Sequence, residues 1–240
     1  MMMMSGAKHS NLVMMSRQAA IEKEIELLSE AMANKAVSGF QASSPHFEEY
    51  VQEGVSYVRY VGVLRNLEHG PLQRTDQKLD VATTKGYFAV MTPKGIRYTR
   101  NGHFKLSPTG EVVNTDGYLL LNEGNAPVVL EDPEQTVIVQ DGTISTQNGV
   151  IGRLKVVEFD NEQNMQDDDL KGYYATEEAE IVPENYQVYQ GFIEGSNVDT
   201  IKTLTRFSLL SHRWQDSHQF QKKHDELELE APTKLAPVNI

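Results

Sequence analysis

The sequence predicts an α+β protein with a long helix at each end of the chain and an antiparallel all-β domain inserted between them. Two observations lead to this fold class. Apolar residues recur at helical spacing from Leu12 to Val37 and again after Asn197. Between these segments, short runs of alternating apolar and polar residues follow one another, separated by glycine-containing turns, as is typical of antiparallel sheets.

The N-terminal segment predicts one amphipathic helix. It contains neither proline nor glycine from Leu12 to Val37. Its apolar residues are separated by seven, four, three and four positions and therefore share one face. Ser38 and Gly39 follow and predict the helix end, because glycine tolerates the left-handed conformation found there. The residues of the stripe are Met14, Ile21, Ile25, Leu28 and Met32.

The C-terminal segment predicts a second helix. Asn197 is placed to cap the free amides at its start, and the helix is expected to run to about Leu229. The second half of this segment is rich in polar residues and has a weak apolar stripe. Pro232 and Pro237 predict a flexible tail. The apolar residues of the stripe are Ile201, Leu204, Phe207, Leu210 and Trp214.

The middle of the chain divides into a connecting region and a β domain. Glycine and proline break the short apolar runs between Gly39 and Asp80, which predicts extended, irregular structure there. From Gly86 the apolar period changes to two, and Asn101-Gly102 is a dipeptide of the type that gives the strongest short hairpin signal. The predicted segments are an N-terminal helix at 1–38, a linker at 39–80, a β domain at 81–192, a C-terminal helix at 193–230 and a tail at 231–240. Strands are expected at 87–91, 96–99, 104–106, 112–113, 118–121, 128–130, 136–139, 143–146 and 154–159.

Composition narrows the possible functions. The chain has 22 Lys and Arg residues against 34 Asp and Glu, a net charge of -12, which disfavours binding to nucleic acid or an anionic membrane surface. The absence of cysteine excludes disulfides, thiolate zinc sites and a cysteine nucleophile. No segment has the apolar length of a secretory signal or a spanning helix, so direct membrane insertion is not expected.

No residue pattern in the chain predicts a catalytic, metal or cofactor site. His212, His218 and His224 are spaced by six, which turns successive side chains to different sides of a helix. The acidic run that begins at Asp167 lacks the alternating ligands of a calcium loop. We therefore expect no enzyme activity and no cofactor.

Five aromatic residues in the predicted strands could form a platform that stacks on sugars or bases. They alternate with aliphatic residues, which favours packing in the core. Two interpretations are also open for the terminal helices. They could cover one face of the β domain, or they could pair through their apolar stripes with each other or with neighbouring subunits. The five aromatic residues are Tyr87, Phe88, Tyr98, Phe104 and Tyr118.

The stretch from Gly86 to Tyr118 resembles the rod and hook proteins of the bacterial flagellum. Motifs in the same order extend the resemblance over nearly the whole chain: an Ala-Asn pair and a Ser-Gly-Phe motif near the end of the N-terminal segment, and Gly-Ser-Asn-Val at the start of the C-terminal one. The matching residues are Asn34, Gly39, Phe40, Asn101, Gly102, Phe104, Asp116, Gly117, Gly195, Ser196, Asn197 and Val198.

The resemblance implies a structural protein that assembles with copies of itself and with other flagellar rod proteins. In such an assembly the terminal helices pair in a coiled-coil-like layer around an axial channel, and the β domain lies outside it. The residues expected to pack between helices are Met14, Ile21, Ile25, Leu28, Met32, Ile201, Leu204 and Phe207.

The motif Gly70-Pro71-Leu72 and the short chain resemble proximal-rod members of the family most, with distal-rod members as the near alternative. The resemblance implies export through the flagellum's own type III apparatus, residence in the rod of the basal body in the periplasmic space, and a role in motility. Ser29-Glu30 and the polar C-terminal helix depart from the family's pattern. Two other classes remain open: a β-rich carbohydrate-active enzyme and a non-axial binding module.

Overall fold

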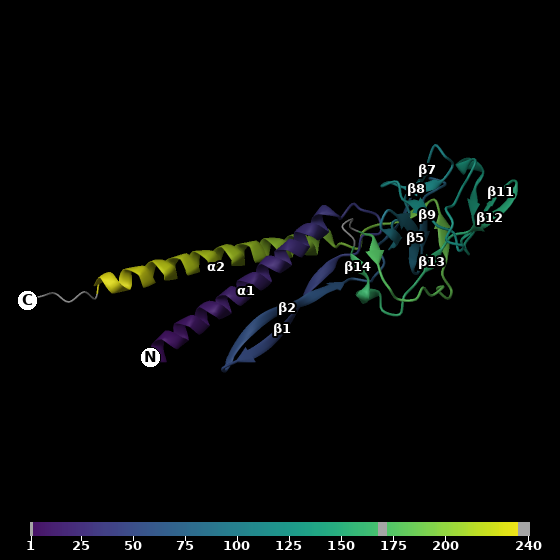
Figure 1. The fold of residues 1–240 in the computed structure, drawn as a ribbon. Coiled ribbons are helices and arrows are strands. Elements are labelled where there is room, and N and C mark those ends of the chain that lie inside the picture. The colour runs from purple at the N-terminus through teal and green to yellow at the C-terminus, as the bar shows by residue number, and fades with distance from the viewer. Residues whose placement is uncertain (1, 168–171, 235–240) are drawn as a thin grey trace, which may run out of the picture. The chain divides into compact units, whose positions relative to one another are not determined.

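The computed structural model describes residues 2–167 and 172–234. The fold is α+β, with two long helices and many short antiparallel strands (Figure 1). The chain forms two compact units. The helical unit consists of Met1–Met32, Ser43–Leu64 and Asp199–Ile240, and the β unit consists of Ala33–Ala42 and Arg65–Val198.

The helical unit contains α1 (Met2–Ala33), the strands β1 (Ser43–Gln52) and β2 (Val55–Arg65), and α2 (Thr200–Lys234). The first helix ends ahead of the predicted stop at Ser38 and Gly39, because the chain already turns after Ala33. The amide of Val37 donates to the carbonyl oxygen of Asn34 at 3.0 Å, which closes this turn.

The predicted linker at 39–80 is wrong for its first half, which forms the long hairpin β1–β2. The hairpin reverses at Glu53 and Gly54, whose φ angles are 51° and 77°. Two consecutive positive φ angles are the geometry that matches the twist of paired strands. Glutamate rarely adopts this conformation, so the turn carries no recognisable sequence signal. The rings of Tyr50 and Tyr57 stack across the strands with centroids 5.2 Å apart.

The second helix differs from its prediction at both ends. Asp199, and not Asn197, caps its start, since the Asp199 carboxylate accepts the amide of Lys202 at 3.0 Å. The helix continues to Lys234 and includes Pro232, so residues 231–234 of the predicted tail are helical. The rest of that tail, 235–240, lies outside the described residues.

Among the described residues, the largest sheet of the β unit has eight strands, in the order β14-β15-β6-β5-β9-β8-β7 with β13 paired to β5. Every pairing is antiparallel. Pairing of Thr92 with Gly95 leaves the two-residue loop that joins β5 to β6. The bounds are β5 (Tyr87–Thr92), β6 (Gly95–Thr99), β7 (Phe104–Leu106), β8 (Val112–Asn114), β9 (Leu119–Leu120), β13 (Val156–Val157), β14 (Gln166–Asp167) and β15 (Tyr174–Ala175).

Three smaller sheets complete the unit. One has the order β10-β11-β12, and the other two pair the end of the unit with its beginning, as β16-β4 and β17-β3. The last two strands of the unit thus lie beside the two strands that open it. The bounds are β3 (Leu72–Arg74), β4 (Val81–Thr83), β10 (Val137–Ile138), β11 (Thr143–Thr146), β12 (Gly149–Arg153), β16 (Val188–Gln190) and β17 (Phe192–Glu194), with short 3-10 helices η1 (Pro133–Gln135) and η2 (Glu162–Asn164).

The hairpin predicted at Asn101-Gly102 is wrong. Strand β6 pairs with β5 and β15, while β7 pairs with β8, so the two strands that flank this dipeptide are not partners. The carbonyl oxygen of Gly102 accepts the amide of Val81 at 2.9 Å. A Cβ on Gly102 would lie 1.5 Å from the Val81 carbonyl oxygen, so close backbone approach requires the glycine.

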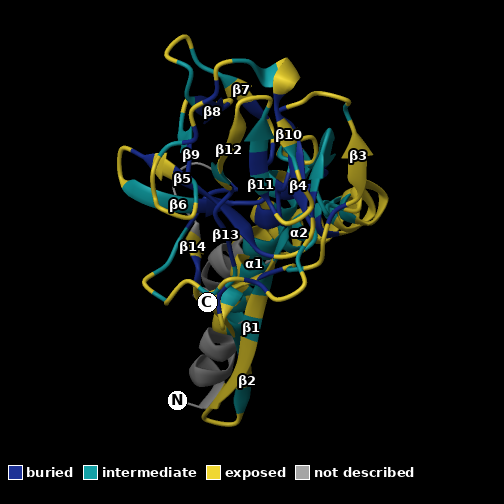
Figure 2. Ribbon diagram, turned by 90° about the vertical axis from the view of Figure 1, so that its right-hand side faces the viewer, coloured by how far each residue is buried: buried dark blue, intermediate teal, exposed yellow. Residues whose placement is uncertain are grey.

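The core lies on both sides of β5 (Figure 2). Phe88 and Val90 point into one cluster of buried apolar residues, while Tyr87 and Ala89 point into the other, as strand geometry dictates. All four are fully buried. The predicted core packing of Tyr87, Phe88, Tyr98 and Phe104 is therefore confirmed, and the less buried Tyr118 packs against the first cluster.

Neither helix is long and apolar enough to cross a membrane over the residues that the structure describes.

Candidate functional site

The face of α2 that is shielded from solvent follows a regular spacing. Its members are separated by four, three, four, three and four residues, the heptad spacing with which helices pair. Leu210 in the middle of this face is buried, with 2% of its surface exposed. The face is apolar from Phe207 to Trp214 and polar toward the C-terminus. Its residues are Thr203, Phe207, Leu210, Trp214, Ser217 and Gln221.

Polar contacts connect α2 to α1. The guanidinium of Arg206 donates to both carboxylate oxygens of Glu24, at 2.6 and 3.1 Å. The hydrogen bond with Glu24 raises the pKa of Arg206 above its ordinary value. The indole nitrogen of Trp214 donates to Glu22 at 2.9 Å. Ile25 and Trp214 also line a groove of about 460 Å³.

The first helix also contacts the hairpin. The hydroxyl of Ser16 accepts the amide of Val58 at 3.5 Å, and the ammonium of Lys23 lies 5.5 Å from the ring centre of Tyr60. Leu27 and Ala31 are its buried residues. Residues on α1 thus contact both α2 and β2.

The eight residues predicted to pack between helices fall into two groups. Those on α1, together with Phe207, are partly buried: Met14, Ile21, Ile25, Leu28 and Met32. Ile201 and Leu204 are exposed, at 79% and 51% of their surfaces. The sequence reasoning missed a third group of exposed apolar residues, which the hairpin presents: Tyr50, Val51, Tyr60, Val61, Val63 and Leu64. The many aromatic and β-branched residues on either side of Gly54, typical of strands, were the available signal.

The family-like motifs converge on Asn197 in the β unit. Its backbone amide donates to the carbonyl oxygen of Phe40 at 3.2 Å, and its side-chain oxygen accepts the amide of Ala42 at 2.7 Å. Its side-chain nitrogen donates to the carbonyl oxygens of Asn66 and Glu68 at 2.9 and 2.8 Å. One side chain therefore joins the segment after α1, the segment after the hairpin and the segment before α2.

Glu194, three residues before Asn197, forms a buried charge pair with Arg100. The carboxylate of Glu194 accepts the amide of Gly70 at 2.9 Å and lies 3.7 Å from the guanidinium of Arg100. Arg100 also donates to the carbonyl oxygen of Leu67 at 3.2 Å and lies 3.6 Å from Glu162. The side chains of Arg100 and Glu194 are each 3% exposed, so each charge depends on the other for compensation.

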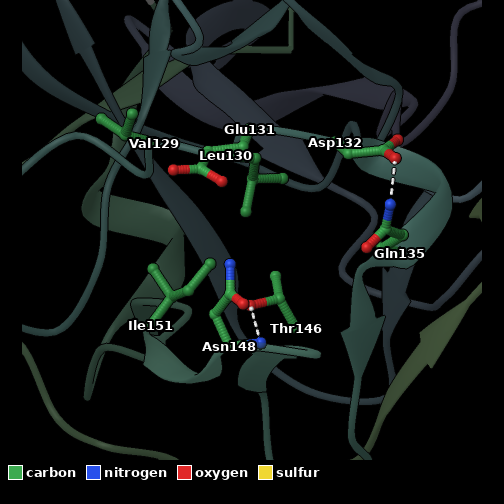
Figure 3. A pocket seen from close by; sticks show the side chains of 8 residues that line it. All are labelled: Val129, Leu130, Glu131, Asp132, Gln135, Thr146, Asn148 and Ile151. Atoms are coloured by element: carbon green, nitrogen blue, oxygen red, sulfur yellow. Dashed lines mark hydrogen bonds between the residues drawn. The ribbon is translucent and has the colours of Figure 1, made fainter.

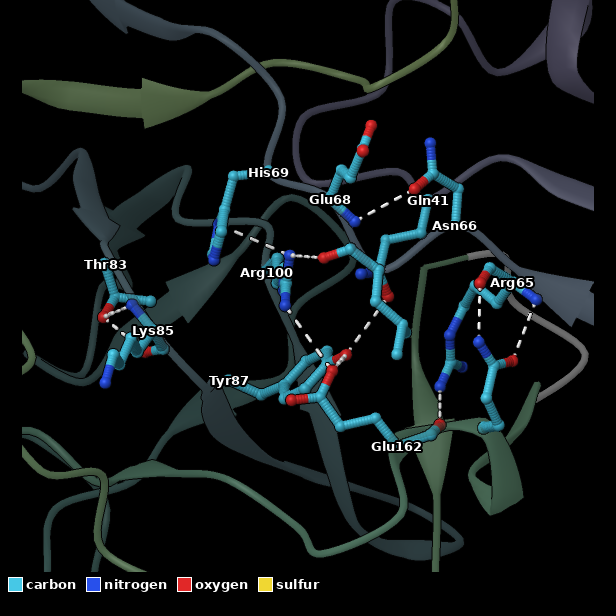
Figure 4. Close-up of polar contacts among 12 residues, drawn as sticks. Gln41, Arg65, Asn66, Glu68, His69, Thr83, Lys85, Tyr87, Arg100 and Glu162 are labelled. Carbon is cyan, nitrogen blue, oxygen red and sulfur yellow. Dashed lines mark hydrogen bonds and ion pairs between the residues drawn. The ribbon is translucent and has the colours of Figure 1, made fainter.

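The buried Tyr87 contacts the same group of charged residues (Figure 4). Its hydroxyl donates to Glu162 at 2.7 Å and lies 3.2 Å from the amide oxygen of Gln41. Burial raises the pKa of Tyr87 far above its ordinary value, against the lowering effect of Arg100, so the hydroxyl keeps its proton. The guanidinium carbon of Arg100 lies 4.9 Å from the centre of the Tyr87 ring.

Close backbone approach explains several motif glycines. Gly39 has a φ of 69°, and a Cβ there would lie 2.3 Å from the Arg100 carbonyl carbon. A Cβ on Gly70 would lie 1.9 Å from the carbonyl oxygen of Gly195. The structure thus brings Gly39, Phe40, Gly195 and Asn197 together.

The other motif residues have local roles. Asn34 closes the turn after α1, and Ser196 accepts the amide of Val198 at 3.3 Å. Phe104 is buried in the core. Asp116 accepts the hydroxyl of Tyr173 at 2.6 Å, beside Gly117 in the turn between β8 and β9.

The β unit also has a shallow groove of about 270 Å³ between the loop at 129–135 and the β11–β12 turn (Figure 3). Glu131 and Asn148 face it from opposite sides. Gln135 donates to Asp132 at 2.7 Å across its rim. Over the described part of the chain, no group of three or more His, Cys, Asp or Glu side chains is placed to hold a metal ion.

The sequence of this chain is similar to those of several known flagellar proteins. Residues 83–146 match the family model described as the flagellar hook protein FlgE/F/G D1 domain. The chain is 33% identical to the flagellar basal-body rod protein FlgF of Rhizobium meliloti, over 85% of this chain and 88% of that protein. It is 27% identical to FlgF of Caulobacter vibrioides over 94% and 97% of the two chains, and 27% identical to the rod protein FlgG of a Buchnera aphidicola strain over 75% and 82%. The chain belongs to the flagellar basal-body rod proteins of the FlgF type.

Proposed function

We propose that this chain is a non-catalytic structural subunit of the proximal rod of the flagellar basal body, where it assembles through its terminal helices into the axial drive shaft for motility. The observation that carries the proposal is the similarity to rod proteins named FlgF over nearly the whole chain. Its partners are copies of itself and other rod proteins.

Different residues of α2 are available for contacts within the chain and for contacts with a neighbouring subunit. Arg206 and Trp214 of α2 donate hydrogen bonds to Glu24 and Glu22 of α1, and Leu210, between them in the sequence, is buried. Ile201 and Leu204 lie outside the shielded face of α2 and are exposed, so a neighbouring subunit can bury them. We propose that such contacts complete a coiled-coil-like inner layer.

The hairpin adds a second apolar surface to the same unit. Val51 is 66% exposed, and Tyr60 and Val61 are 42% and 47% exposed. Helices with modest stripes gain most of their stability from packing, so the helical unit becomes fully ordered on assembly. This behaviour suits export of the unfolded chain through the flagellar type III apparatus, which we propose as its route to the periplasmic rod.

A distal-rod subunit is the second candidate, and the match to FlgG of Buchnera aphidicola favours it. A non-axial β-rich binding module is the third. The proposed roles are the same in either rod position. They belong to the terminal helices at 1–38 and 193–230, to the β domain at 81–192, and to the hairpin β1–β2, which forms within the predicted linker at 39–80. Locating the chain along the rod distinguishes a proximal-rod from a distal-rod subunit. Finding the chain in the rod at all distinguishes both from a binding module.

The variant I201D/L204D tests the assembly role. Both residues are exposed in the single chain, so we expect unchanged thermal unfolding together with strongly reduced recovery in purified basal bodies. The control is V150D, which places a charge at a residue of β12 that is 72% exposed. Equal recovery of I201D/L204D and V150D would contradict helix-mediated assembly.

A further inference from the structure

The chain passes between its two units at four places, after Met32, Ala42, Leu64 and Val198. Asn197 immediately precedes the last of them. Its side chain bonds to Ala42, which borders the second, and to Asn66, close to the third. A single side chain therefore lies at three of the four crossings.

The hydrogen bonds at position 197 require the carboxamide of an asparagine. The side chain of Asn197 accepts one hydrogen bond and donates two, to three backbone groups on two different segments. Aspartate has the same shape but cannot donate, and serine has a single hydroxyl proton. Asn66 and Ala42 are themselves joined, since the amide of Asn66 donates to the carbonyl oxygen of Ala42 at 2.7 Å. The three segments thus form one closed set of hydrogen bonds.

A second set of bonds holds the same segments deeper in the β unit. The carbonyl oxygen of Glu194 accepts the amide of Gly39 at 2.8 Å, and the amide of Gly195 donates to Pro71 at 2.9 Å. The Glu194 side chain also holds Gly70. These contacts do not involve Asn197. The bonds of Asn197 are therefore the outer set, closest to the points where the chain leaves the unit.

We infer that Asn197 is a positioning residue, which holds the start of the hairpin, its end and the approach to α2 at one place on the β unit. The inference rests on the proposed function. In a rod, every subunit must use its helical unit in the same way, so the places where the chain leaves the β unit have to be the same in each subunit. Without these bonds the exit segments fray independently. Assembly then has to order them as it proceeds, which weakens it.

The test compares N197D and N197A with the matched control N148D, which makes the same chemical change at an exposed turn of the full-length protein. Site-resolved hydrogen exchange is measured at the amides of Ala42 and Asn66. We expect exchange there to rise about tenfold or more in both Asn197 variants, as loss of these side-chain hydrogen bonds predicts. The amides of Leu121 and Val128, which bond within the core, are expected to stay unchanged.

Unchanged exchange at Ala42 and Asn66 would overturn the inference. A rise of equal size at Leu121 and Val128 in both variants would overturn it as well, because Asn197 would then support the whole core and not the exits. The N197A variant, which introduces no charge, guards against unfolding caused by the aspartate.

Recovery in purified basal bodies is measured for the same three variants. We expect recovery of N197D and N197A to fall several-fold while N148D matches the wild type. Faster exchange at the exits with normal recovery would contradict the role in assembly. Absence of the wild-type chain from basal bodies would instead contradict the proposed function, and the exchange measurement would still decide whether Asn197 fixes the exits.

Discussion

Arg206 on α2 and Glu24 on α1 form a bidentate ion pair with nitrogen–oxygen distances of 2.6 and 3.1 Å. The two residues are 182 positions apart in the sequence. Arg206 immediately precedes Phe207 of the half-buried α2 face, so the ion pair connects the two helices beside that face.

Exchanging the two charges tests this relationship. The side chains are 46% and 21% exposed, so we expect E24R and R206E each to lower the free energy of unfolding of the helical unit by about 0.5–1 kcal/mol. The double variant should recover most of the loss, and 1 M salt should shrink all three effects. Urea unfolding followed by far-UV circular dichroism measures them. Additive losses in the double variant would show that the residues do not interact.

Two glycines of the family-like motifs are expected to differ sharply when changed to alanine. A Cβ at Gly102 would lie 1.5 Å from the Val81 carbonyl oxygen, so G102A should lower the free energy of unfolding by about 3 kcal/mol or more. Gly117 has a φ of 85° and open space around it, so G117A should cost only the left-handed strain of about 1 kcal/mol. Chemical unfolding of the β unit provides the comparison. Similar losses would contradict the close approach at Gly102.

Gly102 and Glu53 illustrate where sequence reasoning succeeds and fails. The strands on either side of Asn101-Gly102 were predicted from alternation, which depends only on neighbouring residues. Their pairing depends on β5 and β8 elsewhere in the chain, so the dipeptide was wrongly assigned to a hairpin. The hairpin β1–β2 was missed because it turns at Glu53, a residue type that rarely adopts positive φ.

Glu180 is expected to make the β unit sensitive to acid. Burial opposes its ionisation, but hydrogen bonds from Lys155 and Tyr98 outweigh burial and lower its pKa. Because the pKa is lower in the folded state, the stabilisation is complete above the ordinary glutamate pKa of about 4.3 and is lost as the pH falls through the folded-state value. The buried ammonium of Lys155, 2.6 Å away, loses its counter-charge in that range.

The variant E180Q isolates this contribution. At pH 7 we expect it to lower the free energy of unfolding by about 1 kcal/mol, since the pair is partly exposed. The difference from the wild type should shrink as the pH falls below the ordinary glutamate pKa of about 4.3 and through the lower folded-state value. Urea unfolding between pH 3 and pH 7 measures it. A difference that stays constant over this range would refute the assigned pair.

The capping residue of α2 gives a further test. Asp199 accepts the amide of Lys202, and this hydrogen bond lowers the pKa of Asp199. We expect D199A to reduce the helical signal at 222 nm, and D199N to keep most of it because asparagine also caps helices. If D199A and D199N had equal signals, the Asp199 side chain would not be the cap.

Asn197 and Ile201 show what a single sequence reveals about the assembly surface. Asn197 was recognised as a motif residue, yet its assignment as a helix cap was wrong, because its partners at Ala42, Asn66 and Glu68 come from distant segments. Ile201 was chosen from helical spacing alone. Spacing identifies apolar residues on a helix, but it does not say which face the same chain covers and which remains for a neighbour.

The central claim is tested most directly by quantitative mass spectrometry of purified hook–basal bodies, together with a deletion strain examined for rods and hooks. The account predicts a few copies of this chain in each basal body and loss of hooks in the deletion strain. Absence of the chain from basal bodies, with normal hooks after deletion, would contradict a rod role.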